Sequence, residues 1–126
     1  MNIILWILQA LLALIFMYSG ICKSVFSIRK LVDEKGQTGV EHLSLPFVRI
    51  IGISEILGAM GLILPWWLKI FPMLTPITAI LLALIMIPAA RIHYKRKELK
   101  NVFVNLVIFS ICIVIAYGRF YLYHPK

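Results

Sequence analysis

Glu55 is the residue in this sequence whose type and position most clearly indicate chemistry. It lies near the centre of an apolar stretch, RIIGISEILGAMGLILP, which covers residues 49–65. A charged side chain at the middle of a bilayer costs about 2.5–3.5 kcal/mol on insertion scales, so it is kept only when neutral, paired or next to a wet cavity. A carboxyl group in that setting carries protons or attracts cations. Glu55 is therefore the first candidate functional residue.

The composition places this stretch in a membrane. The chain has 126 residues, of which 62% are hydrophobic and 14% charged, and its mean hydropathy is +0.97. Soluble domains carry roughly 45–50% apolar and about 25% charged residues. Because the apolar residues form long blocks, we predict a single membrane domain that covers residues 1–126. Membrane lipids are its first expected partners.

Four apolar blocks are long enough to cross the hydrocarbon core as helices. The sequence therefore predicts an all-α, four-helix transmembrane bundle. Pro46 and Pro65 flank the second block as helix start and stop signals, and Pro76 and Pro88 predict a kink in the third. The expected spans are residues 3–21, 47–64, 70–90 and 102–120.

The basic residues are distributed unevenly between the two ends of these spans. The net charge is +8, with 13 Lys and Arg. Ten of the 13 lie in the two long connections and the adjoining helix ends: Lys23, Arg29, Lys30, Lys35, Arg49, Arg91, Lys95, Arg96, Lys97 and Lys100. The other three are Lys69, Arg119 and Lys126. Lys and Arg favour the cytoplasmic side, so we predict a multi-pass protein of the plasma (inner) membrane, with cytoplasmic basic loops and both termini outside.

The basic residues also bear on the expected partners and on the structure of the first connection. They form no groove interleaved with aromatic residues, so we expect no nucleic-acid partner. The first long connection, residues 23–45, contains the apolar and basic segment SVFSIRKLV. This segment is either a short amphipathic piece on the membrane surface or a polar connection without membrane contact.

Polar residues recur along one face of each predicted helix, and such faces point away from lipid. In the predicted orientation, Gln9, Glu55, Thr78 and Cys112 lie at similar depth, so Gln9 and Thr78 are expected to hydrogen-bond the Glu55 carboxyl. Polar residues nearer the cytoplasmic end would line a pocket above Glu55. The candidate ligand-binding or proton-carrying residues are Glu55, Gln9, Thr78, His93, Asn101, Asn105 and Lys23.

Each candidate also has a purely structural interpretation. Lys23 is of a type that often extends toward the interface, while Asn101 and Asn105 are of a type that bonds neighbouring helices. Arg119 is expected to anchor the outer interface. Glu55 itself has the alternative of a neutral, hydrogen-bonded structural carboxyl. The two cysteines, Cys22 and Cys112, have neither CxxC nor metal-ligand spacing, so we expect no metal site.

Several segments together resemble a known family. Gly20 and Lys23 end the first span, the second reads R-I-x-G-x-x-E-x-L-G-A-x-G-L-I-L-P, and the third contains PMLTPITAILLALIM. A basic loop with His93 follows, and then Asn105 and a closing Tyr-Gly-Arg at residues 117–119. This order resembles the DoxX-like family of small four-helix integral membrane proteins over nearly the whole chain. The second-span motif is its most specific part.

The resemblance implies a bacterial-type inner membrane protein associated with redox complexes, because the family takes its name from a quinol-oxidase or thiosulfate:quinone oxidoreductase subunit. The first hypothesis is therefore an accessory or quinone-associated subunit of a membrane redox system. In it, Glu55 or His93 would carry protons. Electrons would come from a partner subunit, since the sequence has no haem, iron–sulfur or flavin motif. We expect no intrinsic cofactor other than a bound quinone and no enzymatic activity from the chain on its own.

Two other hypotheses stay open. One is a protein that binds or transports a small lipophilic or cationic molecule, because a carboxylate in low dielectric attracts a cation strongly. Such a small transporter would need to form a homo-oligomer, and the small pair Ser54 and Gly58 would allow helices to approach closely. The other is a non-catalytic assembly factor, in which Glu55 only specifies helix packing.

Overall fold

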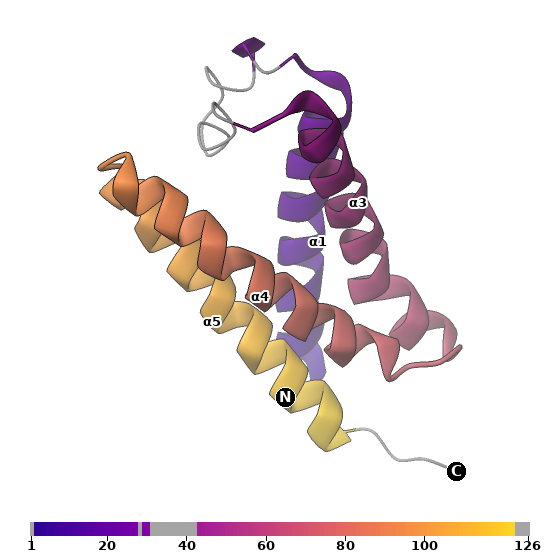
Figure 1. The fold of residues 1–126 in the computed structure, drawn as a ribbon. Helices are drawn as coiled ribbons and strands as arrows, with labels where there is room; N and C mark the ends of the chain where they lie inside the picture. Colours follow the sequence, from indigo (N-terminus) through magenta and orange to yellow (C-terminus); the bar gives the residue numbers. More distant parts are fainter. Residues whose placement is uncertain (1, 28, 31–42, 123–126) are drawn as a thin grey trace.

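The computed structural model describes residues 2–27, 29–30 and 43–122, and these contain four long helices. All four are long and apolar enough to cross a membrane. They confirm the predicted all-α, four-helix transmembrane bundle (Figure 1). The helices are α1 (Asn2–Val25), α3 (Leu45–Leu68), α4 (Leu74–Lys95) and α5 (Leu99–Leu122). Most of the connection between α1 and α3 lies outside the described residues, including Ile28, Leu31 and Val32 of the segment considered amphipathic.

The ends of the helices differ from those of the apolar blocks that predict them. α3 passes through Pro65 and ends at Leu68, whereas we expected the helix to stop before that proline. α4 begins at Leu74, because the preceding turn contains Lys69 and Phe71 in the left-handed backbone region, with φ of 58° and 48°. Hydropathy marks the length that lies in hydrocarbon, whereas hydrogen bonding sets the helix ends, so the two sets of boundaries differ.

Pro65 is accommodated inside α3 by a side chain from the next helix. Proline lacks the N–H that would bind the carbonyl four residues earlier, which is that of Gly61. The hydroxyl of Thr75 in α4 donates to the Gly61 carbonyl oxygen at 3.0 Å. A buried carbonyl in a membrane needs such a partner, so Thr75 both satisfies α3 and ties α4 to it.

The four helices form two closely packed pairs, α1 with α3 and α4 with α5. The pairs converge near the termini and spread apart toward the α4–α5 turn (Figure 1). The buried core between them is built from apolar and small residues of all four helices, such as Leu12, Leu62, Ala79 and Cys112. Many large apolar side chains on the outer faces are exposed, as expected of surfaces that contact lipid.

Candidate functional site

Glu55 is buried inside the bundle and forms an ion pair with Lys23. Its Oε1 lies 2.6 Å from Lys23 Nζ, and only 2% of the residue is exposed. Lys23 Nζ also donates to the hydroxyl of Ser19 at 3.1 Å. Lys23 therefore turns inward from the end of α1 instead of extending along the surface. Glu55 is shielded from lipid, as the sequence requires of a carboxylate at this position.

A close contact between two glycines positions the pair. A Cβ on Gly20 of α1 would lie 2.6 Å from the Gly52 carbonyl oxygen, and a Cβ on Gly52 would lie 2.8 Å from the Gly20 carbonyl oxygen. The two backbones thus touch directly, as small residues allow in membrane helices. Lys23 follows Gly20 by three residues, and Glu55 follows Gly52 by three residues. Each therefore lies about one turn beyond the glycine contact, on the helix face that carries the glycine.

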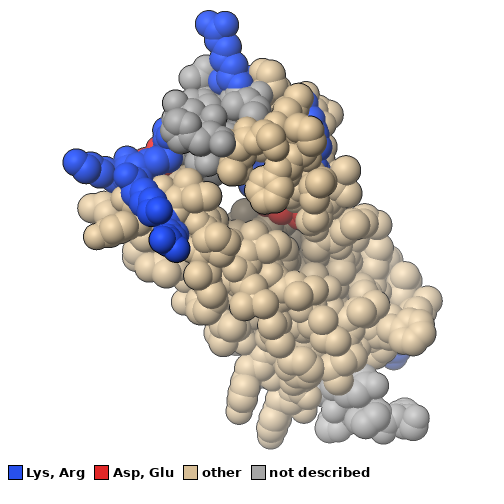
Figure 2. Space-filling view, in the orientation of Figure 1, with Lys and Arg blue, Asp and Glu red and all other residues tan. Residues whose placement is uncertain are grey.

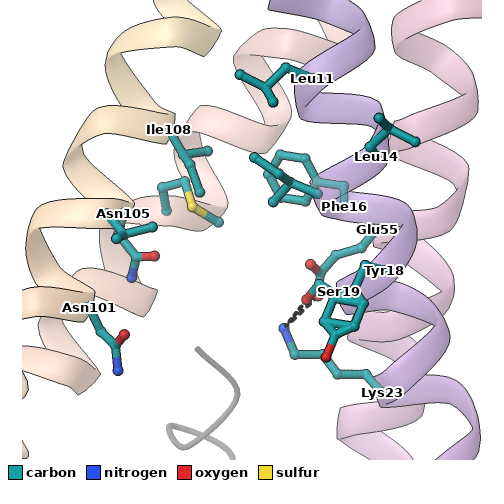
Figure 3. A pocket seen from close by; sticks show the side chains of 13 residues that line it. Leu11, Leu14, Phe16, Tyr18, Ser19, Lys23, Glu55, Asn101, Asn105 and Ile108 are labelled. Atoms are coloured by element: carbon teal, nitrogen blue, oxygen red, sulfur yellow. Dashed lines mark hydrogen bonds and ion pairs between the residues drawn. The ribbon is translucent and has the colours of Figure 1, made fainter. Parts of the chain in front are cut away.

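A pocket of about 430 Å³ lies beside this pair, between α1 and α5. The walls of the pocket are mostly apolar and include Phe16 and Ile108, while Asn101 and Asn105 face the ion pair from α5 (Figure 3). Figure 2 shows acidic atoms inside a hollow on this side of the molecule. The pocket thus combines apolar walls with one polar end.

The pocket opens sideways, through residues on the surface that would face lipid. Leu14 is 71% exposed, and Leu11 and Val104 on the same rim are exposed as well. A lipophilic molecule can enter such an opening from the membrane without crossing water. This geometry suits a ligand with an apolar body and a polar group.

Asn105 presents an unused hydrogen-bond donor to this space. Its side-chain Nδ2 is buried and, within the described part of the chain, has no hydrogen-bond acceptor. In the structural interpretation, the Asn105 side chain would hydrogen-bond a neighbouring helix. That interpretation does not explain why Nδ2 has no acceptor. A buried amide group without a partner is costly, so a ligand acceptor in the pocket would satisfy it.

The hydrogen bonds expected between Gln9, Thr78 and Glu55 were wrong. Gln9 Nε2 donates to the Leu62 carbonyl at 2.6 Å, and Gln9 Oε1 accepts from Arg119. Thr78 lines a separate groove of about 620 Å³ between α3 and α4. Residues at similar depth point in different directions here, because the two helix pairs spread apart and each polar face meets a different neighbour.

His93 lies outside the residues that line the pocket. It is 5% exposed, and its Nδ1 lies 2.8 Å from Glu98 Oε1, which also accepts from Arg96 Nε at 3.3 Å. The Glu98 backbone N–H donates to the His93 carbonyl. This cluster closes the tight turn between α4 and α5.

Two arginines are placed by hydrogen bonds that the sequence did not indicate. Arg49 Nη1 donates to the carbonyls of Lys23 and Phe26, at 2.8 and 2.7 Å, and so holds the end of α1. Arg49 thus binds the backbone of α1, whereas the ion-pair partner of Glu55 is Lys23. Arg119 lies in the last turn of α5, where an outer-interface anchor was expected, but its side chain is wholly buried among α1 and α3 instead of extending outward. One feature of the sequence could have indicated a buried position for Arg119. Helical periodicity places it on the same face of the last helix as Asn105 and Cys112.

No group of three or more His, Cys, Asp or Glu side chains in the described ranges is arranged to hold a metal ion. The polar groups at the pocket are instead an ammonium, a carboxylate, two amides and the hydroxyls of Tyr18 and Ser19. These groups bind by hydrogen bonds and charge. They suit an organic ligand with oxygen acceptors.

The fold and this site define a small multi-pass membrane protein with an ion pair buried between its helices. The chain belongs to the DoxX-like family, whose model matches residues 7–115. The matched range contains Lys23, Glu55, Asn101 and Asn105, and it ends before Arg119. No curated protein and no solved structure matched the chain.

Proposed function

We propose that this protein binds a neutral lipophilic molecule with carbonyl groups, of the quinone type, in the pocket between α1 and α5. It would act there as an accessory subunit of a membrane redox system. The observation that carries this proposal is the Lys23–Glu55 pair at the polar end of an apolar pocket that opens toward lipid.

The pairing of Glu55 favours a neutral ligand over a cationic one. Lys23 already neutralises the carboxylate at 2.6 Å, so a cation would have to displace an ammonium group tied to the same protein. A carboxylate attracts a cationic substrate strongly only while it is unpaired. That alternative loses its main support.

The donors at the polar end match the acceptors of a quinone. The Lys23 ammonium has three N–H groups, of which two are directed to Ser19 and Glu55. The third, and Nδ2 of Asn105, would donate to carbonyl oxygens of the ligand. Glu55 would exchange a proton with the ligand when a partner subunit delivers electrons, because quinone reduction consumes two electrons and two protons.

The proposed location is the plasma membrane, with the basic end of the bundle in the cytoplasm. Lys and Arg gather at the end where the helix pairs spread apart (Figure 2). The positive-inside rule then places both termini outside, and the polar end of the pocket lies in the cytoplasmic half. Protons for the ligand would thus come from the cytoplasmic side.

The test is direct binding of short-tailed benzoquinone and naphthoquinone analogues to the purified full chain in lipid nanodiscs. We expect saturable binding to the wild type, weakened at least tenfold by Lys23→Met and by Asn105→Leu. Ser110→Ala is the matched control, because the Ser110 hydroxyl binds the Leu106 carbonyl on an exposed face. No binding to the wild type, or equal binding to all variants, would contradict the proposal.

A lipophilic cation separates this proposal from the transport alternative. Tetraphenylphosphonium should not bind the wild type above its lipid background, because Lys23 neutralises Glu55. It should bind Lys23→Met, where the carboxylate has lost its partner. Tight binding to the wild type that Glu55→Gln abolishes would instead support a cation carrier.

A further inference from the structure

A second polar site lies at the other end of the bundle, around Arg119 in the last turn of α5. The residue is completely buried. Its Nε donates to Gln9 Oε1 at 2.5 Å, and its Nη1 donates to Asn2 Oδ1 at 2.5 Å. Its Cζ lies 4.6 Å from the centroid of the Trp66 ring and 5.2 Å from that of Trp6. Side chains from α1 and α3 thus hold the guanidinium of α5.

These contacts leave the guanidinium incompletely satisfied. Nη2 of Arg119 is buried and has no hydrogen-bond acceptor. Its bonded partners are neutral amides, and the two aromatic rings carry no charge. Within the described ranges the carboxylates are Glu55 and Glu98, and each is paired elsewhere, with Lys23 and with His93. The site therefore holds a buried positive charge with an unused donor.

The surroundings of the guanidinium add to its positive potential. α1 begins at Asn2, and the first N–H groups of a helix lack intrahelical acceptors and attract anions. Asn2 is exposed, so its side chain forms the outer wall of the site and an incoming group can displace it. An arginine fork and a helix N-terminus are two recurrent elements of phosphate recognition.

We propose that Arg119, together with Gln9, Asn2, Trp6 and Trp66, forms a binding site for a phosphate-type oxyanion. Two anion oxygens would accept from Nη2 and Nη1 of Arg119, the second replacing the side chain of Asn2. Trp66 and Arg119 occupy the ends of their helices, at the level where tryptophans meet lipid headgroups. The anion is therefore a lipid headgroup phosphate or a free phosphate from solution.

Tryptophan fluorescence reports on this site directly. The chain has 3 tryptophans, and Trp67→Phe removes the one that is exposed and outside the site. In that background, in zwitterionic nanodiscs, we expect a saturable change in emission on titration with phosphatidylglycerol or with inorganic phosphate. The arm that responds identifies the source of the anion. No response in either arm would overturn the proposal.

Three variants separate a built site from general charge attraction. Gln9→Glu places a carboxylate next to Nε of Arg119, so it should lower anion affinity at least tenfold while the protein stays folded. Arg119→Lys keeps the charge without the fork and should weaken binding to a similar extent. Arg49→Gln removes a cation at the opposite end and should bind normally. Equal affinity in Gln9→Glu and wild type, or equal loss in Arg49→Gln, would overturn the proposal.

Quenching by brominated lipids gives a readout that needs no arginine variant. In the Trp67→Phe background, phosphatidylglycerol with brominated chains should quench Trp6 and Trp66 more strongly than phosphatidylcholine with the same chains if the headgroup is held at Arg119. If free phosphate is the ligand, the two lipids should quench equally and phosphate alone should change the emission. Equal quenching without a phosphate response contradicts both sources.

Discussion

The side chain of Lys23 is long enough to reach the membrane surface, but it turns inward to Glu55. Taking either charge out of water is expensive, and attraction between the two offsets this only when the geometry is good. The 2.6 Å contact and the additional bond to Ser19 meet that condition. The pair is therefore best tested as one unit, since removing either member leaves the other uncompensated.

A double-mutant cycle at this pair gives the first prediction. Lys23→Met alone should lower the free energy of unfolding by about 3–5 kcal/mol, because Glu55 stays buried without its partner. Adding Glu55→Leu should recover most of that loss, since well-packed apolar residues replace both charges. Denaturant unfolding of the full chain in detergent micelles measures the coupling. Additive effects of the two substitutions would show that the pair does not interact in the folded protein.

Two prolines and two glycines show how single residues set the behaviour of whole helices. Pro65 remains inside α3 because Thr75 binds the carbonyl that proline leaves without a donor. Pro76 lies in the first turn of α4, where no intrahelical N–H is needed. Gly20 and Gly52 set the distance between α1 and α3, and hence the position of the ion pair that follows them.

The second prediction concerns that helix contact. Gly52→Ala should destabilise the protein by about 1–3 kcal/mol, because the new methyl group meets the Gly20 backbone and the packed helices must separate. The separation should also weaken the Lys23–Glu55 contact and reduce ligand binding at the pocket. Unfolding in micelles and the quinone-binding assay measure the two effects.

Gly58→Ala provides the matched control for this prediction. A Cβ there meets the far end of the Leu82 side chain at 2.8 Å instead of backbone. A leucine side chain can change its rotamer, so the loss of stability should be smaller and the ion pair should be unaffected. If Gly58→Ala reduces binding as much as Gly52→Ala, the effect does not come from the glycine contact.

At the scale of the whole molecule, the two helix pairs meet near the termini and separate toward the basic end (Figure 1). Arg119 helps to hold the closed end, because it joins α5 to α1 through Gln9 and Asn2 and contacts Trp66 of α3. The pocket occupies the separated region between α1 and α5. The helix pairs are thus packed together near the termini, and they leave room for a ligand toward the basic end.

The third prediction tests the orientation of this arrangement in the membrane. In a background with Cys22 and Cys112 replaced by alanine, single cysteines at Lys97→Cys and Lys69→Cys probe the two exposed turns. A membrane-impermeant maleimide should label position 69 in intact cells, and position 97 only after the membrane is permeabilised. The reverse pattern would place the basic turn outside.

The sequence by itself determined that the protein lies in a membrane, that its fold is all-α, and that Glu55 is the first candidate functional residue. Long apolar blocks exclude a water-soluble core, and their lengths require helices because a membrane offers no hydrogen bonds to an open backbone. Glu55 stood out because a carboxylate in such a block is costly wherever the neighbouring helices lie. These properties depend on composition along one segment, so they can be derived without knowing any contact.

The partners of the polar side chains were decided only by the tertiary structure. Lys23 binds Glu55, whereas Gln9 binds Leu62 and Arg119, although depth alone suggested that Gln9 and Thr78 would bind Glu55. The rotation of each helix and the spreading of the two pairs depend on contacts such as Gly20 with Gly52. Helical periodicity places a side chain on a face, but only the packing of one helix on another decides which face it meets.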